Sequence, residues 1–217
     1  MPSNKPALKA NGNRQAAYSA RNKARLIKDA QEVLAEIGPS ATIEQLAAHA
    51  EVSPTTIYKY FENKDKLFLE ALGEMWHGWV SWSFKQTTAT DEIEATFESV
   101  RRVFRLKQTH PQLAQIFHNT LRQFPDFIVD ADEGTAKRVF GRLASTGKIN
   151  GENFDQRFEI WTGIFYSLLE AIYVTEKFTA EEADAALGIG LSVWGITEAK
   201  AKKMISRPIA VSLHAIK

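Results

Sequence analysis

The sequence predicts an all-α protein. Apolar residues recur at helical spacing along most of the chain, Gly and Pro interrupt these runs, and no stretch of useful length alternates in the manner of a strand. The chain has 217 residues, of which 44% are hydrophobic and 24% are charged, so it can bury a sizeable core in one or two domains. Because cysteine is absent, a disulfide framework and a thiolate metal site are both excluded.

We expect residues 1–20 to form a flexible basic arm. Residues 1–28 contain seven Lys or Arg and no acidic residue, mixed with Asn, Ser and Pro. Such a segment is either a solubilising tail or an arm that seeks phosphate, and composition leaves both open. No apolar segment resembles a secretion signal, and no apolar run approaches the roughly 18 residues that span a bilayer. We therefore expect a cytoplasmic protein with no membrane contact.

Two helices are expected next. The first runs from about Arg21 to Ile37, and Gly38-Pro39 ends it. The second opens with a capping box, in which Thr42 is the N-cap and Gln45 follows three residues later. A tight turn then leads to a third helix, which is very short.

The third helix has an unusual outer face. Ser53 is a good N-cap and Pro54 suits the first helical position, while Ile57 and Phe61 lie one turn apart and form the buried side. At about 100° per residue, the remaining positions point away from the core or to its flanks. They all carry hydrogen-bonding groups: Thr55, Thr56, Tyr58 and Lys59.

Two helices joined by a tight turn, the second short and polar outside, are the parts of a helix-turn-helix that reads B-DNA. Hydroxyl and ammonium groups on such a helix can bind phosphates and base edges in the major groove. The free N–H groups at the start of a helix also bind phosphate favourably. Thr42 and Lys64, which lie at the starts of the second and fourth helices, are therefore candidate contacts to the DNA backbone. The alternative is a small three-helix packing unit with a solvated polar face.

The order of residues from about 22 to 72 resembles the N-terminal domain of the TetR family of bacterial transcriptional regulators. The resemblance rests on Thr42-Ile43, Leu46-Ala47, Val52-Ser53, Thr56-Ile57-Tyr58-Lys59-Tyr60-Phe61 and Lys64-Asp65-Lys66-Leu67. It implies a DNA-binding domain at 21–70 with its motif at about 43–62. The DNA-binding residues that it implies are Thr42, Ser53, Pro54, Thr55, Thr56, Tyr58, Lys59, Tyr60 and Lys64. Many members have Lys or Arg and then Gly or Ala where this chain has Pro54-Thr55, so its base preference cannot be transferred.

The resemblance also implies a C-terminal domain at 71–205 that binds a small molecule and dimerises, followed by a tail at 206–217. A long fourth helix, capped by Asn63, would connect the two domains. Further helices are expected near 91–108, 111–124, 126–146, 155–176 and 180–204. A stripe of small residues every four positions, Gly163, Ser167 and Ala171, suggests one side of a dimer seam, and Ala186, Gly190 and Trp194 of the final helix continue it. A seam within one chain would show the same pattern.

Aromatic residues crowd this second domain, and an apolar ligand pocket would be lined by residues of this type with a few polar groups. The candidates are Trp76, Trp79, Phe104, Phe117, His118, Trp161, Phe165 and Tyr166. Core packing is the competing explanation for each aromatic side chain. No histidine has an acidic or second histidine partner four residues on, so we expect no metal site and no cofactor.

These features together predict a regulator that binds a pseudo-palindromic operator in double-stranded DNA as a homodimer. We expect a repressor that an apolar or aromatic small molecule releases, located at the bacterial nucleoid. A DNA-binding or architectural protein without an effector is the alternative. An enzyme ranks third, because no nucleophile elbow, zinc-protease motif or phosphate-cradling glycine loop occurs.

Overall fold

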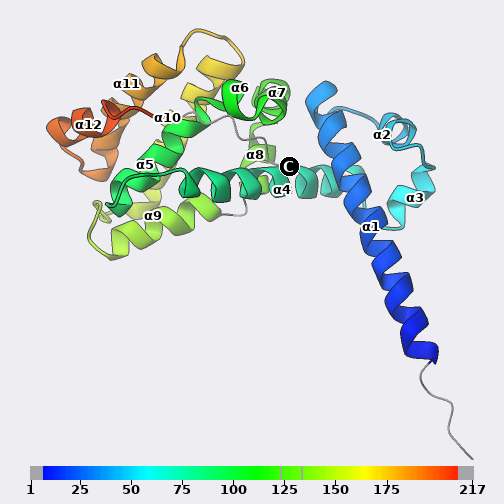
Figure 1. Cartoon of the computed structure of the whole chain (residues 1–217). Coiled ribbons are helices and arrows are strands. Elements are labelled where there is room, and N and C mark those ends of the chain that lie inside the picture. Colours follow the sequence, from blue (N-terminus) through cyan, green and yellow to red (C-terminus); the bar gives the residue numbers. More distant parts are fainter. Residues whose placement is uncertain (1–6, 123, 133, 210–217) are drawn as a thin grey trace, which may run out of the picture. The chain divides into compact units, whose positions relative to one another are not determined.

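The computed structural model describes residues 7–122, 124–132 and 134–209 (Figure 1). Helices are the only regular secondary structure in these ranges, which confirms the predicted all-α class. The chain divides into two compact units, Met1–Ala71 and Leu72–Lys217, and the division falls within one helix.

The first unit contains α1 (Ala7–Glu36), α2 (Ile43–His49), α3 (Pro54–Tyr58) and the start of α4 (Lys64–Lys85). The capping box predicted for α2 is present: Thr42 Oγ1 accepts the Gln45 N–H at 3.2 Å, and Gln45 Oε1 accepts the Thr42 N–H at 2.7 Å. Apolar side chains from all four helices close a small core. It consists mainly of Leu26, Ala30, Val33, Leu34, Leu46, Ile57, Phe61, Leu67 and Phe68.

Helix α1 begins at Ala7, so the expectation of a flexible arm at 1–20 is wrong for residues 7–20; residues 1–6 lie outside the described part. The segment 7–20 contains five alanines and no proline, but also Asn11-Gly12-Asn13, whose helix propensity is low. Apolar residues at helical spacing are missing from it, so periodicity alone does not predict this part of the helix. Side chains from Arg14 to Tyr18 are exposed.

The second unit contains the rest of α4 and, within the described residues, nine further helical segments. They are α5 (Glu92–Val103), α6 (Leu106–Thr109), α7 (Pro111–Thr120), α8 (Pro125–Asp132), α9 (Thr135–Ser145), α10 (Phe154–Tyr173), α11 (Ala180–Gly190), the 3-10 helix η1 (Leu191–Trp194) and α12 (Glu198–Ile205). Helix α10 packs against α7, α9, α11 and η1, and α11 packs against α12. Helix α10 is thus the central element of this unit.

Three expected helices are broken in the structure. The segment 126–146 is two helices because Gly134 turns with φ of 70°, and 180–204 is interrupted by η1 and by Gly195 with φ of 73°. Glycine adopts positive φ without steric cost, so both turns fit their residue. The segment 91–108 also divides, into α5 and α6 on either side of Arg105.

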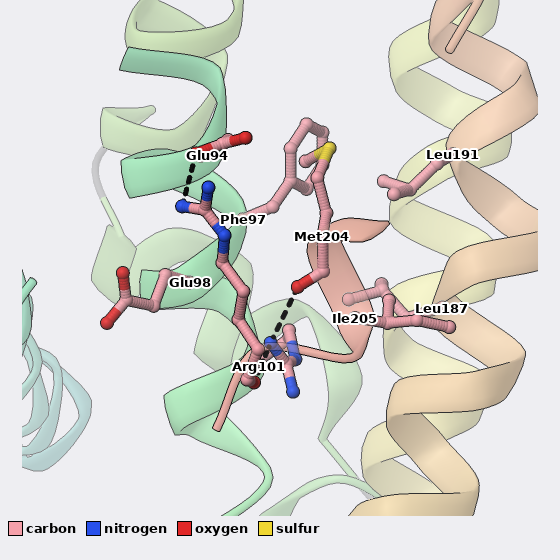
Figure 2. A pocket seen from close by; sticks show the side chains of 9 residues that line it. Glu94, Phe97, Glu98, Arg101, Leu187, Leu191, Met204 and Ile205 are labelled. Atoms are coloured by element: carbon pink, nitrogen blue, oxygen red, sulfur yellow. Dashed lines mark hydrogen bonds and ion pairs between the residues drawn. The ribbon is translucent and has the colours of Figure 1, made fainter. Parts of the chain in front are cut away.

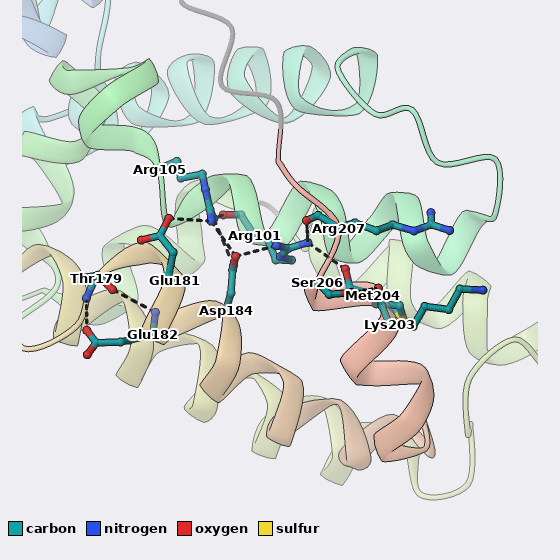
Figure 3. A network of polar contacts seen from close by, with 10 residues as sticks. All are labelled: Arg101, Arg105, Thr179, Glu181, Glu182, Asp184, Lys203, Met204, Ser206 and Arg207. Carbon is teal, nitrogen blue, oxygen red and sulfur yellow. Dashed lines mark hydrogen bonds and ion pairs between the residues drawn. The ribbon is translucent and has the colours of Figure 1, made fainter.

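A buried ionic network connects α5 to α11 and to the end of α12 (Figure 3). The Asp184 carboxylate on α11 accepts hydrogen bonds from Arg101 Nη2 and Arg105 Nη2, both at 2.8 Å. Arg101 Nη1 also donates to the carbonyls of Met204 and Arg207, at 3.0 Å each. One carboxylate therefore holds two buried guanidinium groups, and one of these fastens the chain after α12.

Candidate nucleic-acid interface and ligand cavity

The short helix α3 is held by its own N-cap. Ser53 Oγ accepts the Thr56 N–H at 3.3 Å and lies 3.0 Å from Thr56 Oγ1, and Pro54 occupies the first turn. Ile57 is fully buried. This anchoring orients the opposite face outward, where Thr55, Tyr58 and Lys59 are exposed; Tyr58 is 53% exposed.

Tyr60 and Lys64, two further residues of the predicted DNA face, have partners inside the first unit. The Tyr60 hydroxyl accepts a hydrogen bond from Asn22 Nδ2 at 3.3 Å, and Lys59 Nζ lies 5.7 Å from the centre of the Tyr60 ring. Lys64 Nζ donates to the Pro39 carbonyl at 2.7 Å and lies 3.3 Å from an Asp65 carboxylate oxygen. The ammonium of Lys64 thus also ties the start of α4 to the α1–α2 turn.

The second unit contains a cavity of about 330 Å³ between α4, α5 and α7–α10. Six of the eight predicted ligand residues line it: Trp76, Trp79, Phe117, Trp161, Phe165 and Tyr166. The Trp76 and Trp79 rings stack with centroids 5.0 Å apart and planes at 18°. This volume falls in the lower part of the usual range for small-molecule sites, and an aromatic wall suits a flat apolar ligand.

A few polar groups interrupt the apolar wall. The Asp132 carboxylate accepts the Trp76 indole N–H at 2.7 Å and the Ala136 N–H at 2.9 Å, so it holds one tryptophan and binds the first turn of α9. Trp79 is buried, and its indole N–H has no acceptor among the described residues. Sequence reasoning missed Asp132 and Thr135, because it expected one unbroken helix over 126–146 and no helix start near these residues.

Two predicted ligand residues lie outside the cavity, and we correct both. Phe104 is buried, with its ring centroid 6.2 Å from that of Phe165, and belongs to the core. The His118 side chain lies on the exposed side of α7, where Nδ1 is 2.7 Å from the Tyr173 carbonyl and donates to it. Helical spacing alone did not show that Phe117 faces the cavity while the adjacent residue His118 faces away from it.

A second hollow lies between α5, α11 and α12 (Figure 2). Its volume is about 10 Å³, which holds about one water molecule. Arg101, Phe97 and Met204 fill most of this region, and the buried ionic network closes it. It is too small to be a ligand site.

The predicted dimer residues separate into two groups. Gly163 and Ser167 on α10 are exposed, Ala171 and Ala186 are half-buried, and a Cβ placed on Gly163 would meet nothing within 4 Å. These four positions remain available to a partner.

Gly190 and Trp194 are removed from the seam. A Cβ on Gly190 would lie 3.2 Å from Ile164, so this glycine permits close packing of α11 on α10 within one chain. Trp194 is buried and stacks on Phe140 with ring centroids 4.9 Å apart. Gly190 and Trp194 therefore pack within one chain, as the alternative explanation of the pattern predicts.

Metal sites and membrane-spanning helices were also considered for the described residues. No three His, Asp or Glu side chains there come together in a way that could hold a metal ion. Within the same ranges, none of the helices combines the length and apolar character needed to cross a bilayer.

Comparison with known proteins agrees with the arrangement of the first unit. Residues 26–71 match the family model described as "Bacterial regulatory proteins, tetR family". The HTH-type transcriptional regulator RutR of Escherichia coli strain K12 is 29% identical over 136 residues. That alignment covers 61% of this chain, and the chain spans only 63% of the length of RutR.

Solved structures share the fold of both units. RolR in complex with resorcinol superposes with a TM-score of 0.68 at 20% identity, covering 91% of this chain and 100% of RolR. A TetR-family transcriptional regulator from Streptomyces coelicolor gives a TM-score of 0.58 at 13% identity, covering 86% of this chain and 89% of that one. The helix-turn-helix of the first unit coincides with the matched residues, and residues 26–71 therefore belong to the TetR family of bacterial regulatory proteins.

Proposed function

We propose that this chain is a repressor that binds operator DNA through α3 and is released by an apolar or aromatic small molecule bound in the 330 Å³ cavity. It would act as a homodimer on a pseudo-palindromic operator, in the cytoplasm at the nucleoid. The observation that carries the proposal is the pair of sites: an exposed polar recognition face in one unit and an aromatic cavity in the other.

The exposed face of α3 supports DNA binding. Thr55, Tyr58 and Lys59 supply a methyl group, hydroxyls and an ammonium without a carboxylate among them. Such groups can enter a major groove, bind phosphates and touch base edges. A carboxylate on this face would repel the DNA backbone.

The cavity supports an effector and weighs against a purely architectural protein. A domain that served only dimerisation would gain stability by filling this space, because interiors are close-packed. RolR, which shares the fold, has been solved with resorcinol, a small aromatic molecule. For this chain we propose an aromatic ligand that packs against the Trp76 and Trp79 rings in the cavity wall.

An exposed apolar strip on the second unit supports the homodimer. Ile160 on α10 is 57% exposed and Ile189 on α11 is 79% exposed. The small residues Gly163 and Ser167 continue the α10 side of this strip, so a second copy could approach closely. Burying such side chains against a partner is favourable, at about 25 cal/mol per Å² of apolar surface.

The proposal is tested by selecting bound duplexes from a random pool and screening aromatic compounds for release of the selected duplex. We expect one pseudo-palindromic site, and at least one compound that both quenches tryptophan fluorescence saturably and weakens DNA binding. Replacing Thr162 at the cavity wall with Phe should reduce the response to that compound while DNA affinity persists. Selection without any preferred sequence would reject the operator. Saturable quenching that leaves DNA affinity unchanged would reject release by ligand.

A further inference from the structure

The part of α1 that ends at Lys28 carries a row of four basic side chains and one tyrosine that the recognition face does not explain. Its members are Arg14, Tyr18, Arg21, Arg25 and Lys28, which we call the α1 stripe. They are spaced 4, 3, 4 and 3 residues apart, so at about 100° per residue they fall within an arc of about 80°. All five are exposed, and Tyr18 is 60% exposed.

The stripe lies opposite the face that packs into the first unit. Leu26 and Ala30 on the other side of α1 are buried in the core. Lys23, also outside the stripe, pairs with Glu70 at 2.7 Å. No ion pair involves the stripe among the described residues. Asp29 is the acid whose charge interacts with Arg25 and Lys28, and burial raises the pKa of its carboxyl.

Helix α1 leaves the body of the first unit beside the recognition helix. The hydrogen bond from Asn22 to Tyr60 joins α1 to the residue that follows α3 and Lys59. Residues 7–21 extend beyond that contact without another helix beside them (Figure 1). At 1.5 Å per residue this extension is about 22 Å long, enough to follow about six phosphates at 3.4 Å per strand.

We propose that the α1 stripe is a second DNA contact, in which Arg14 and Arg21 bind backbone phosphates of the duplex that α3 reads. This rests on the proposed DNA-binding function. A helix that lacks a packing partner is marginal in water, so ordering by a ligand is expected to stabilise it. The stripe has the charge to bind a polyanion, and no acidic residue precedes Asp29.

The segment between Arg14 and Arg21 argues against other partners. Its positions outside the stripe are Gln15, Ala16, Ala17, Ser19 and Ala20, which include no bulky apolar residue. A helix that lies on a membrane needs a large apolar face, and a protein interface needs buried aromatic or aliphatic anchors. A phosphate backbone needs neither.

The test compares salt dependence in two double variants of the full chain. Arg14→Gln with Arg21→Gln removes two stripe charges, and Lys202→Gln with Lys203→Gln removes two exposed charges from α12 as a matched control. The measurement is log Kobs against log salt on the selected operator and on a mixed-sequence duplex. Because each phosphate contact contributes about 0.9 to the slope, the stripe variant should have a slope shallower by about 1.8 per bound protomer, which is about 3.6 for the proposed homodimer. The control should match the wild type.

A third variant, Ala17→Pro, keeps every charge but interrupts the helix. We expect its salt slope to become shallower, as in the stripe variant, because the arginines no longer lie on one face of the helix. An unchanged slope in the stripe variant, or an equal loss in the α12 control, overturns the proposal. If the salt slope of Ala17→Pro equals that of the wild type, the arginines do not need to lie on one helix face. The helical stripe is then rejected, and a non-helical cationic arm explains the binding. If no operator is selected but the stripe variant still has a shallower salt slope on mixed-sequence DNA, the proposed operator is rejected and the α1 stripe is retained as a DNA contact. Absence of binding to both duplexes would overturn both proposals.

Discussion

Removing the Asp184 carboxylate should destabilise the second unit more than any single surface change. Asp184 is 8% exposed at its side chain and accepts hydrogen bonds from Arg101 and Arg105, whose side chains are 5% and 8% exposed. In Asp184→Ala both guanidinium groups remain buried without their common anion. Breaking a buried pair in this way costs about 3 to 5 kcal/mol. Arg101 keeps its two carbonyl acceptors, which places the expected loss near the lower end of that range.

Two matched variants separate charge from shape. Asp184→Asn retains the shape and one acceptor oxygen, and should lose about 1.5 to 3 kcal/mol, the range for hydrogen bonds to charged groups. Glu181→Ala removes a carboxylate that is 78% exposed and 3.5 Å from Arg105, so it should leave stability unchanged. The assay is urea unfolding followed by tryptophan fluorescence and circular dichroism. If Asp184→Ala unfolds at the same midpoint as Glu181→Ala, the network does not hold α11 to α5 as inferred here.

Three further outcomes are expected. Tyr58→Phe should weaken binding to all duplexes alike, whereas Lys59→Ala should change base preference at one half-site position by about 1 to 3 kcal/mol, as binding titrations on single-base variants would reveal. Ser167→Trp should abolish the dimer in sedimentation by overpacking the proposed seam; a monomeric wild-type chain at micromolar concentration would remove the seam altogether. Burial lowers the pKa of His110 below 6.5, so the unfolded chain binds the proton first as pH falls. Stability should therefore decline below about pH 6.5, and His110→Phe should flatten that decline in unfolding measured from pH 7.5 to 5.

Local chemistry explains which elements could be predicted from the sequence. The N-caps Thr42 and Ser53 act on residues three positions away, so the starts of α2 and α3 follow from a few neighbouring side chains. The turns at Gly134 and Gly195 were not predicted, because a glycine within a helical pattern does not reveal its φ. Helix α1 was predicted to start late, since apolar periodicity ends where its packing ends.

Long-range contacts explain what the sequence did not reveal about the sites. Lys64 binds the Pro39 carbonyl 25 positions earlier, and Gly190 accommodates Ile164 on another helix. Neither contact leaves a local pattern. The aromatic cavity was predicted more completely, because residues at i and i+4 on α4 and α10 share a face whatever packs against them. Phe104 and His118 required knowledge of which face of α5 or α7 the cavity occupies.

Helix α10 carries both the cavity wall and the proposed seam. Trp161, Phe165 and Leu169 face the cavity at intervals of four residues, while Ile160 and Ser167 are exposed on the opposite side. A ligand that fits the cavity better after α10 moves must therefore also change the surface offered to a second copy. The change in dimer affinity can be no larger than the difference in ligand affinity between the two positions of α10. A tight ligand that binds both positions equally would occupy the cavity and alter nothing at the seam.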